Sequence, residues 1–173
     1  MEVSAACIKE LREQCGAGIM DCRAALVKTE GDMEKALELL REQGFAKAAK
    51  KADRTTEQGL VEAYIHCGGR IGAMVEVNCE TDFVARTDEF KELAHNIAMQ
   101  VAAMNPAYIS EEDIPADMCE EDRAELDVNS VCLLKQAYIK DPSLTINDII
   151  VNNIAKMGEN IKVSRIARFD LSE

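Results

Sequence analysis

The feature that most constrains the fold is residues 75–86, which begin as a strand and end in polar and aromatic residues. Val75 and Val77 alternate with polar residues, the period of two that is typical of a half-buried strand. At its end, Asp82 and Phe83 stand next to each other, and neighbours in an extended chain point to opposite sides. One core cannot easily bury both. From the local pattern, Phe83 either caps the core beneath the next helix or serves another purpose.

The N-terminal part, residues 1–44, is predicted to form three short helices. Ser4 and Asp32 are suited to cap the first and third helices, and Gly44 is expected to end the third. Three helices in about 40 residues make a small bundle, near the lower size limit for independent folding. The bundle resembles a ubiquitin-associated domain. Residues 45–56 follow as a basic connector, predicted to be partly helical.

The remaining residues, 57–173, are predicted to form an α+β core in which helices cover an antiparallel sheet. The predicted elements are strands at 59–66 and 71–79, helices at 87–104, near 130–140 and near 145–157, and a last strand from 161 to about 171. Gly68-Gly69 is a hairpin signal between the first two strands. Thr145 is a plausible cap for the last helix.

The charge of the chain is uneven and argues against a nucleic-acid ligand. The net charge is −12, and residues 57–173 hold ten basic and twenty-two acidic residues. Residues 111–127 alone carry nine carboxylates and one arginine, the pattern of an acidic loop or a solvated helix. Binding to a phosphate backbone needs a basic footprint. The sequence therefore favours a protein partner.

The sequence also predicts the cellular location of the protein and the absence of a metal or cofactor. No apolar run of about 18 residues suggests a membrane span, and the first residues lack the pattern of a signal peptide. We therefore expect a cytoplasmic protein. The seven cysteines are odd in number and none form a C-x-x-C pair, whereas zinc sites need closely spaced ligand pairs. We expect free thiols, no metal and no cofactor.

Three motifs resemble one family. Asn-Cys-Glu-Thr-Asp-Phe-Val-Ala-Arg at residues 78–86 is similar to the signature of elongation factor Ts, the guanine-nucleotide exchange factor of elongation factor Tu. A second match covers residues 11–13 and 16–23, and a third covers residues 157–163. They occur in the family's order and span nearly the whole chain. The length leaves no room for the second core subdomain and coiled-coil insertion of long members, so the chain resembles the short kind.

The resemblance implies a function and a first site. A member binds elongation factor Tu in its GDP-bound and nucleotide-free forms, promotes GDP release and so allows GTP to bind. It is an exchange factor and not an enzyme. The matching motif enters the GTPase domain near its magnesium ion, which carries over to Thr81, Asp82, Phe83 and Val84. Phe83 would be the wedge and Asp82 would disturb the magnesium-binding region, while Thr81 and Val84 would hold the turn.

The resemblance also implies a second contact through the N-terminal bundle. The positions that carry over are Arg12, Ile19, Met20 and Arg23. Family members commonly have methionine in place of Ile19, and isoleucine keeps the contact apolar. Arg12 and Arg23 can equally be read as ordinary solvated helix charges. Short members can pair through their cores, and a three-stranded sheet leaves edges that invite pairing, so we expect a homodimer.

Two other classes of protein compete with this interpretation. The first is a ubiquitin-type adaptor, which the N-terminal bundle supports but which leaves residues 57–173 unexplained. The second is a thiol enzyme that uses Cys79 with His66 or His95. A cysteine nucleophile needs a base within reach and a lowered pKa, and neither follows from the sequence. The resemblance favours the exchange factor.

Overall fold

The first and third helices begin directly after the predicted capping residues. The structure, a computed structural model, describes residues 3–119 and 125–171. The helices are α1 (Ala5–Cys15), α2 (Ile19–Lys28) and α3 (Met33–Ala49). The side chain of Ser4 accepts a hydrogen bond from the Cys7 N–H, and that of Asp32 accepts one from the Lys35 N–H. Both predicted N-caps are therefore confirmed. The buried apolar cluster of the bundle consists of Leu11, Cys22, Ala25, Leu26, Ala36 and Leu40.

The predicted end of the third helix at Gly44 is wrong, because α3 continues to Ala49. Gly44 is buried, and a methyl group added to it would lie 3.6 Å from the Cγ1 of Val151. A single glycine costs a helix interior about 1 kcal/mol relative to alanine. Close packing at Gly44 and the alanines that follow it offset this cost, so the glycine marks a contact and not a helix end.

The chain divides into two compact units. One consists of Met1–Arg54 and Val151–Asn160 and contains α1 to α3. The other consists of Thr55–Ile150 and Ile161–Glu173 and contains the main sheet. Helix α8 (Ile146–Met157) supplies residues to both units.

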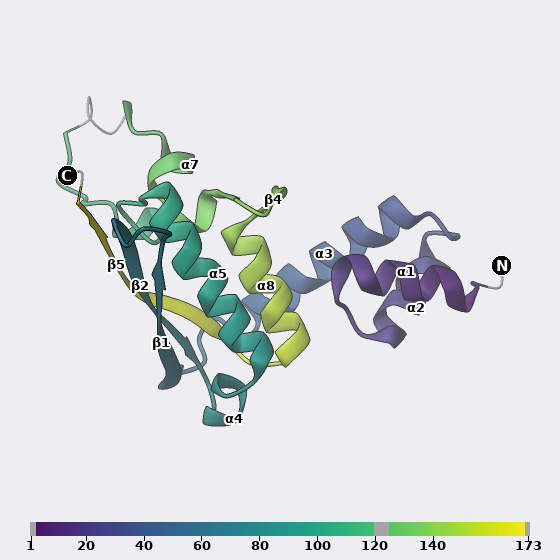
Figure 1. Ribbon diagram of the computed structural model, residues 1–173. Helices are drawn as coiled ribbons and strands as arrows, with labels where there is room; N and C mark the ends of the chain where they lie inside the picture. The colour runs from purple at the N-terminus through teal and green to yellow at the C-terminus, as the bar shows by residue number, and fades with distance from the viewer. Residues whose placement is uncertain (1–2, 120–124, 172–173) are drawn as a thin grey trace. The chain divides into compact units, whose positions relative to one another are not determined.

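A three-stranded antiparallel sheet is the framework of the second unit (Figure 1). Its strands are β1 (Gln58–Ile65), β2 (Ile71–Cys79) and β5 (Ile161–Asp170), in the order β1-β2-β5. Val75 lies opposite Glu62 on one side and Ile166 on the other. Gly68 and Gly69 both have positive φ, 87° and 68°, in the turn between β1 and β2. The predicted hairpin and the last strand are confirmed.

The two faces of this sheet differ in what covers them. Val75 and Val77 are fully buried on the face along which α5 (Asp88–Met104) runs (Figure 1). The side of α5 that faces the core carries Phe90, Leu93, Ala94, Ile97, Ala98 and Val101, all buried. These residues belong to the apolar stripe that predicts the helix, whereas Met104 at the end of that stripe is exposed. Thr87 caps the start of the helix. On the opposite face of the sheet the large apolar side chains are exposed: Val61, Ile65, Met74 and Phe169.

The predicted helix near residues 130–140 is wrong. The chain there forms a short helix α7 (Val128–Val131), a 3₁₀ turn η2 (Leu133–Lys135) and strand β3 (Ala137–Tyr138), which pairs with β4 (Asp141–Thr145). Two buried amides explain the difference. The Nε2 of Gln100 donates to the Oε1 of Gln136 at 3.1 Å, and the Ile139 N–H donates to the Oε1 of Gln100 at 3.0 Å. Backbone bonded to Gln100 cannot at the same position continue a helix.

The last predicted helix and the acidic segment complete the chain. Helix α8 follows Thr145, whose Oγ1 accepts a hydrogen bond from the Asp148 N–H at 3.1 Å, so the predicted cap is confirmed. In the acidic segment, a 3₁₀ turn η1 (Glu111–Asp113) is exposed, and Glu111 pairs with Lys135 at 2.7 Å. Residues 120–124 of that segment lie outside the described residues.

Candidate functional site

The first predicted site is a single helical turn, α4 (Asp82–Ala85), between β2 and α5 (Figure 1). Threonines hold it at both ends. The Oγ1 of Thr81 accepts a hydrogen bond from the Val84 N–H at 3.4 Å, and the Oγ1 of Thr87 donates to the Val84 carbonyl at 2.8 Å. Both side chains bond local backbone groups, as threonine does at helix starts. The turn thus has a defined backbone from which its side chains project.

Phe83 is the most exposed large apolar side chain of the described residues, with 79% of its surface accessible. The interpretation in which Phe83 caps the core is therefore wrong. The helical turn explains this, because Ala85 is the residue that it buries, and Phe90 of α5 fills the core instead. The exposed ring of Phe83 contributes little to the stability of the fold. An exposed aromatic on a rigid turn is typical of a binding anchor.

Asp82 stands beside this anchor and is held by a local ion pair. Its Oδ2 lies 2.8 Å from the Nη2 of Arg86, one helical turn further on. The Arg86 side chain is largely accessible and that of Asp82 is half-buried, and pairs of this kind contribute about 0–1 kcal/mol. The Asp82 carboxylate is therefore oriented in the free protein. Breaking its pair with Arg86 to form a contact with a partner would cost little free energy.

A buried thiol supports the backbone just before the turn. The Sγ of Cys79, the last residue of β2, donates to the Thr81 carbonyl at 3.2 Å. The histidines are engaged elsewhere: the Nδ1 of His95 lies 2.9 Å from the Oε1 of Glu62, and His66 bonds the Tyr64 hydroxyl at 3.2 Å. These contacts favour a structural role for Cys79 and give no support to a thiol enzyme.

The second predicted site lies at the start of α2 and the end of α1. Ile19 and Met20 follow Gly18 directly and are 56% and 69% exposed, although both are large and apolar. Arg12 and Arg23 are exposed as well. The Nζ of Lys47 lies 2.8 Å from the Oδ2 of Asp21, which ties the first turn of α2 to α3.

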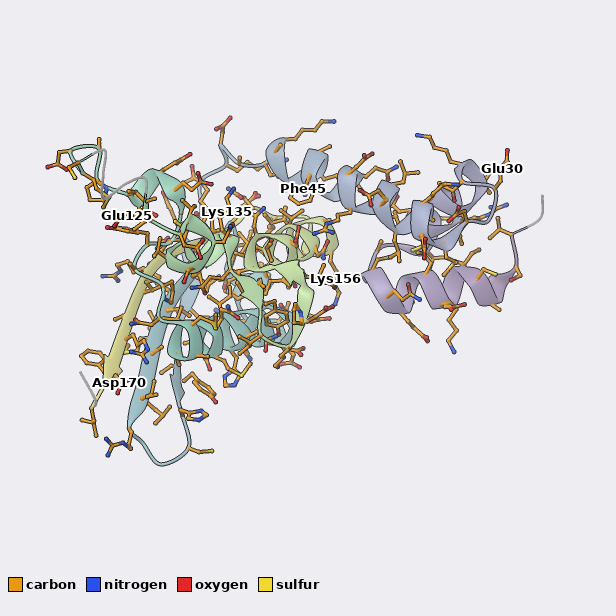
Figure 2. The ribbon with its side chains drawn as sticks, turned by 90° about the horizontal axis from the view of Figure 1, so that it is seen from above. Glu30, Phe45, Glu125, Lys135, Lys156 and Asp170 are labelled. Atoms are coloured by element: carbon orange, nitrogen blue, oxygen red, sulfur yellow. The ribbon has the colours of Figure 1, made fainter. Side chains whose placement is uncertain are left out.

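A groove of about 430 Å³ brings two of these residues together. Its lining residues are Ala5, Ile8, Lys9, Arg12, Glu13, Gly16, Ile19 and Lys156. Arg12 and Ile19 line the groove, whereas Met20 and Arg23 lie outside it. The lining combines apolar side chains with three basic ones and Glu13, whose Oε1 lies 3.7 Å from the Nζ of Lys9. The groove is therefore basic on balance and fits an apolar segment with acidic neighbours. Figure 2 labels Lys156, which extends from α8.

Sequence reasoning missed some of these groove residues, for different reasons. Ile8 lies on the same apolar face of the first helix as Leu11, but it is only partly buried and also lines the groove. Ala5 and Lys9 are one helical turn apart, and that spacing was a signal that they share a face. Nothing in the sequence relates Lys156 to the N-terminal helices, since more than a hundred residues separate them.

The described residues contain no group of three or more histidine, cysteine, aspartate or glutamate side chains that could hold a metal ion. Among the helices in the described ranges, none is both long and apolar enough to cross a bilayer. Both candidate sites consist instead of exposed apolar side chains with charged neighbours, on locally braced helix starts. This arrangement, on an N-terminal helical bundle and an α+β unit, is typical of surfaces that bind another protein.

Comparison with known proteins identifies the family. The family model of elongation factor TS matches residues 28–128. The chain is 49% identical over 195 residues to an elongation factor Ts of Desulfosudis oleivorans, covering 99% of this chain and 98% of the relative. It is 50% identical over 195 residues to that of Thermotoga petrophila, covering 100% and 98% of the two chains. The chain therefore belongs to the elongation factor Ts family and has a role in translation elongation.

Proposed function

We propose that this protein binds elongation factor Tu in its GDP-bound and nucleotide-free states and promotes GDP release, so that GTP can bind. The observation that carries the proposal is the 79% exposure of Phe83 on a braced turn, next to a weakly paired carboxylate. The family membership names the partner. The geometry of the turn and the physics of nucleotide exchange support the proposed mechanism.

Exchange is slow in a GTPase because a phosphate loop and a magnesium ion hold the nucleotide strongly. A partner accelerates release by binding best to a conformation in which these contacts are broken. By linkage, the nucleotide then lowers the affinity of the GTPase for the partner by the same factor by which the partner lowers its affinity for the nucleotide. Loosening a nucleotide from nanomolar to micromolar affinity takes about 4 kcal/mol of differential binding.

Phe83 is the residue of the turn that can supply most of this energy. A buried aromatic anchor contributes roughly 2–4 kcal/mol at the centre of an interface. In the free protein most of the Phe83 side chain is in water, so most of its burial would be gained on docking. Phe83 acts as the wedge that displaces an element of the GTPase domain. Asp82 enters the GTPase domain beside Phe83 and disturbs the magnesium-binding region, while Thr81 and Val84 hold the turn.

The N-terminal bundle supplies a second contact in this proposal. Ile19 and Met20 expose apolar surface at a helix start, and Arg12 lies in the groove beside Ile19. Arg23 is one turn from Ile19 on the same face of α2. These side chains dock on the GTPase and raise the affinity. The turn at α4 performs the exchange, which involves no covalent chemistry.

We further propose that the protein is a homodimer in the cytoplasm and that the uncovered face of the sheet is the contact between copies. Val61, Ile65, Met74 and Phe169 form an exposed apolar surface there, here called the open sheet face. At its polar end, Arg165 bonds Glu76 and thereby lowers the pKa of that carboxyl group. A surface with apolar residues and both charges is self-complementary, as a two-fold contact requires. Two such sheets would pack face to face.

The experiment that tests the exchange function is direct. Elongation factor Tu is loaded with fluorescent GDP, excess unlabelled GDP is added, and the release rate is followed with and without the protein. We expect release to accelerate with protein concentration. The variant Phe45→Ala, which removes a phenylalanine that projects from α3 (Figure 2), is the control and should accelerate release equally. A release rate that is unchanged at saturating protein would contradict the proposal.

A further inference from the structure

Two cysteines of the bundle lie close together without being bonded. Cys15 is the last residue of α1, Cys22 is in α2, and their Sγ atoms are 3.9 Å apart. Cys22 is buried in the bundle core, whereas Cys15 is only partly buried. A disulfide bond is about 2.05 Å long, so the two sulfurs would have to approach by roughly 2 Å. Rotation of the side chains and a small movement at the end of α1 can provide this.

Two glycines between these cysteines leave space for that movement. Gly16 has a φ of 66°, and a methyl group added to it would meet no atom within 4 Å. At Gly18 the nearest atom to an added methyl group is a side-chain oxygen of Asp21, at 3.7 Å. There is therefore open space at both glycines, although Ala17 between them packs against the bundle core, and a small shift of α1 meets no close contact at Gly16 or Gly18.

We propose that Cys15 and Cys22 form a dithiol site that low-molecular-weight disulfides, such as glutathione disulfide, oxidise to an intramolecular disulfide. The Cys15 thiolate attacks one sulfur of the reagent, which forms a mixed disulfide and releases one glutathione thiolate. The Cys22 thiolate then attacks the Sγ of Cys15, the mixed disulfide breaks and a second glutathione thiolate leaves. The protein loses two electrons and two protons, and one reagent disulfide becomes two thiols.

The environment of each cysteine assigns the order of the two steps. Cys15 is the more accessible thiol and meets the reagent first. Burial, followed by the neighbouring Cys15 and then Asp21, raises the pKa of the Cys22 thiol to about 11, while Arg12 acts in the opposite direction. Few Cys22 side chains are thiolates at neutral pH, so ring closure is the slow step. Its rate should rise with pH, and a strong reductant reverses it.

The position of this dithiol gives it a consequence for binding, and this part rests on the proposed function. The segment that the disulfide would close, residues 15–22, contains the exposed pair Ile19 and Met20, and Arg12 lies just before it. Drawing Cys15 toward Cys22 moves the end of α1 against the start of α2, and so changes the shape of the groove that Arg12 and Ile19 line. Oxidation is therefore expected to weaken docking of the bundle.

The chemistry can be tested without any partner, because cleavage after Arg12 and Arg23 leaves both cysteines in one peptide, residues 13–23. The protein is treated with glutathione disulfide, alkylated and digested with trypsin. The mass of this peptide is then measured by mass spectrometry without prior reduction. We expect it to be two hydrogen atoms lighter and not alkylated. Cys15→Ser should abolish this product, and Cys22→Ala should leave a glutathione adduct on Cys15. Cys67→Ser, which removes an exposed thiol elsewhere, should change nothing.

Either of two results would overturn the dithiol site: a wild-type peptide that carries only glutathione adducts or unmodified thiols, or one joined to the peptide that contains Cys7.

Binding to elongation factor Tu is then compared for reduced, oxidised and re-reduced protein. We expect at least about fivefold weaker binding on oxidation, reversed by reductant and absent in Cys15→Ser. Equal binding of both forms would overturn the consequence for docking. If the reduced protein does not bind at all, the proposed function fails and the dithiol chemistry stands.

Discussion

At the scale of single residues, the property that decides between the competing interpretations is exposure. Phe83 and Phe90 are seven residues apart and chemically identical, yet the first is 79% exposed and the second is fully buried. Asp82 and Arg86 are paired but accessible. Substitutions of exposed residues change the free energy of folding little, whereas substitutions of buried ones change it strongly. Binding and stability can therefore be separated residue by residue.

We predict that Phe83→Ala slows GDP release by at least about tenfold at a fixed, subsaturating concentration, a loss of about 1.4 kcal/mol or more. Its melting temperature should barely change, because the ring is exposed. Truncating a core phenylalanine would instead cost about 3–5 kcal/mol of folding free energy. Asp82→Ala should slow release less. A Phe83→Ala protein that melts far earlier but exchanges normally per folded molecule would end the wedge model.

Cys79→Ala is predicted to keep most of the exchange activity. The Cys79 thiol is buried, and its hydrogen bond to the Thr81 carbonyl is a weak one. Removing it should lower the melting temperature modestly through lost packing, while the threonines still hold the turn. Exchange rates and melting curves on the same preparation check this. Complete loss of exchange in a stable, correctly folded variant would revive the thiol hypothesis.

Cys22 should make the free energy of unfolding fall in alkaline solution. Burial raises the pKa of its thiol to about 11 from an ordinary 9.0. Between these values the unfolded chain has released a proton that the folded chain keeps, so stability decreases as pH rises. Thermal unfolding under reducing conditions, followed between about pH 8 and pH 11, should show a steeper loss for the wild type than for Cys22→Ala. Parallel curves would contradict this assignment.

At the scale of elements, local patterns predicted those helices and strands whose stability is local. The stripe of α5, the alternation of β2 and the caps Ser4 and Thr145 all act over a few residues, and the structure confirms them. The helix predicted near 130–140 failed because Gln100, some 36 residues away, takes the hydrogen bonds of that segment. The helix end predicted at Gly44 failed because Val151 packs on the glycine. In both cases a distant residue outweighed the local preference.

The start of α2 is the element for which we predict a binding defect without a folding defect. Met20→Asp should weaken binding to elongation factor Tu by about tenfold or more, because it places a charge in an apolar contact. The fold should survive, since the side chain is 69% exposed. Met20→Leu is the matched control and should bind nearly as well as the wild type. Titration by calorimetry measures binding and circular dichroism the fold. Unchanged binding in a folded Met20→Asp variant would remove the bundle from the interface.

At the scale of the whole molecule, the open sheet face predicts the oligomeric state. Phe169 is 71% exposed there, so Phe169→Asp should leave each copy folded and turn dimers into monomers. Phe83→Asp makes the same change on the turn at α4 and should leave the dimer intact. Sedimentation equilibrium over a range of concentrations measures both. A wild type that is monomeric at every concentration would show that the open sheet face is not a dimer contact.

The sequence by itself determined the family, the fold class and the positions of the two candidate sites. It could do so because periodicity, capping and motifs act between neighbours in the chain. Only the tertiary structure decided that Phe83 is exposed, that Lys156 joins the groove of Arg12, and that Cys15 lies beside Cys22. Exposure and proximity depend on which distant residues occupy the space around a side chain. That outcome is a property of the packed unit and cannot be read from any short stretch of residues.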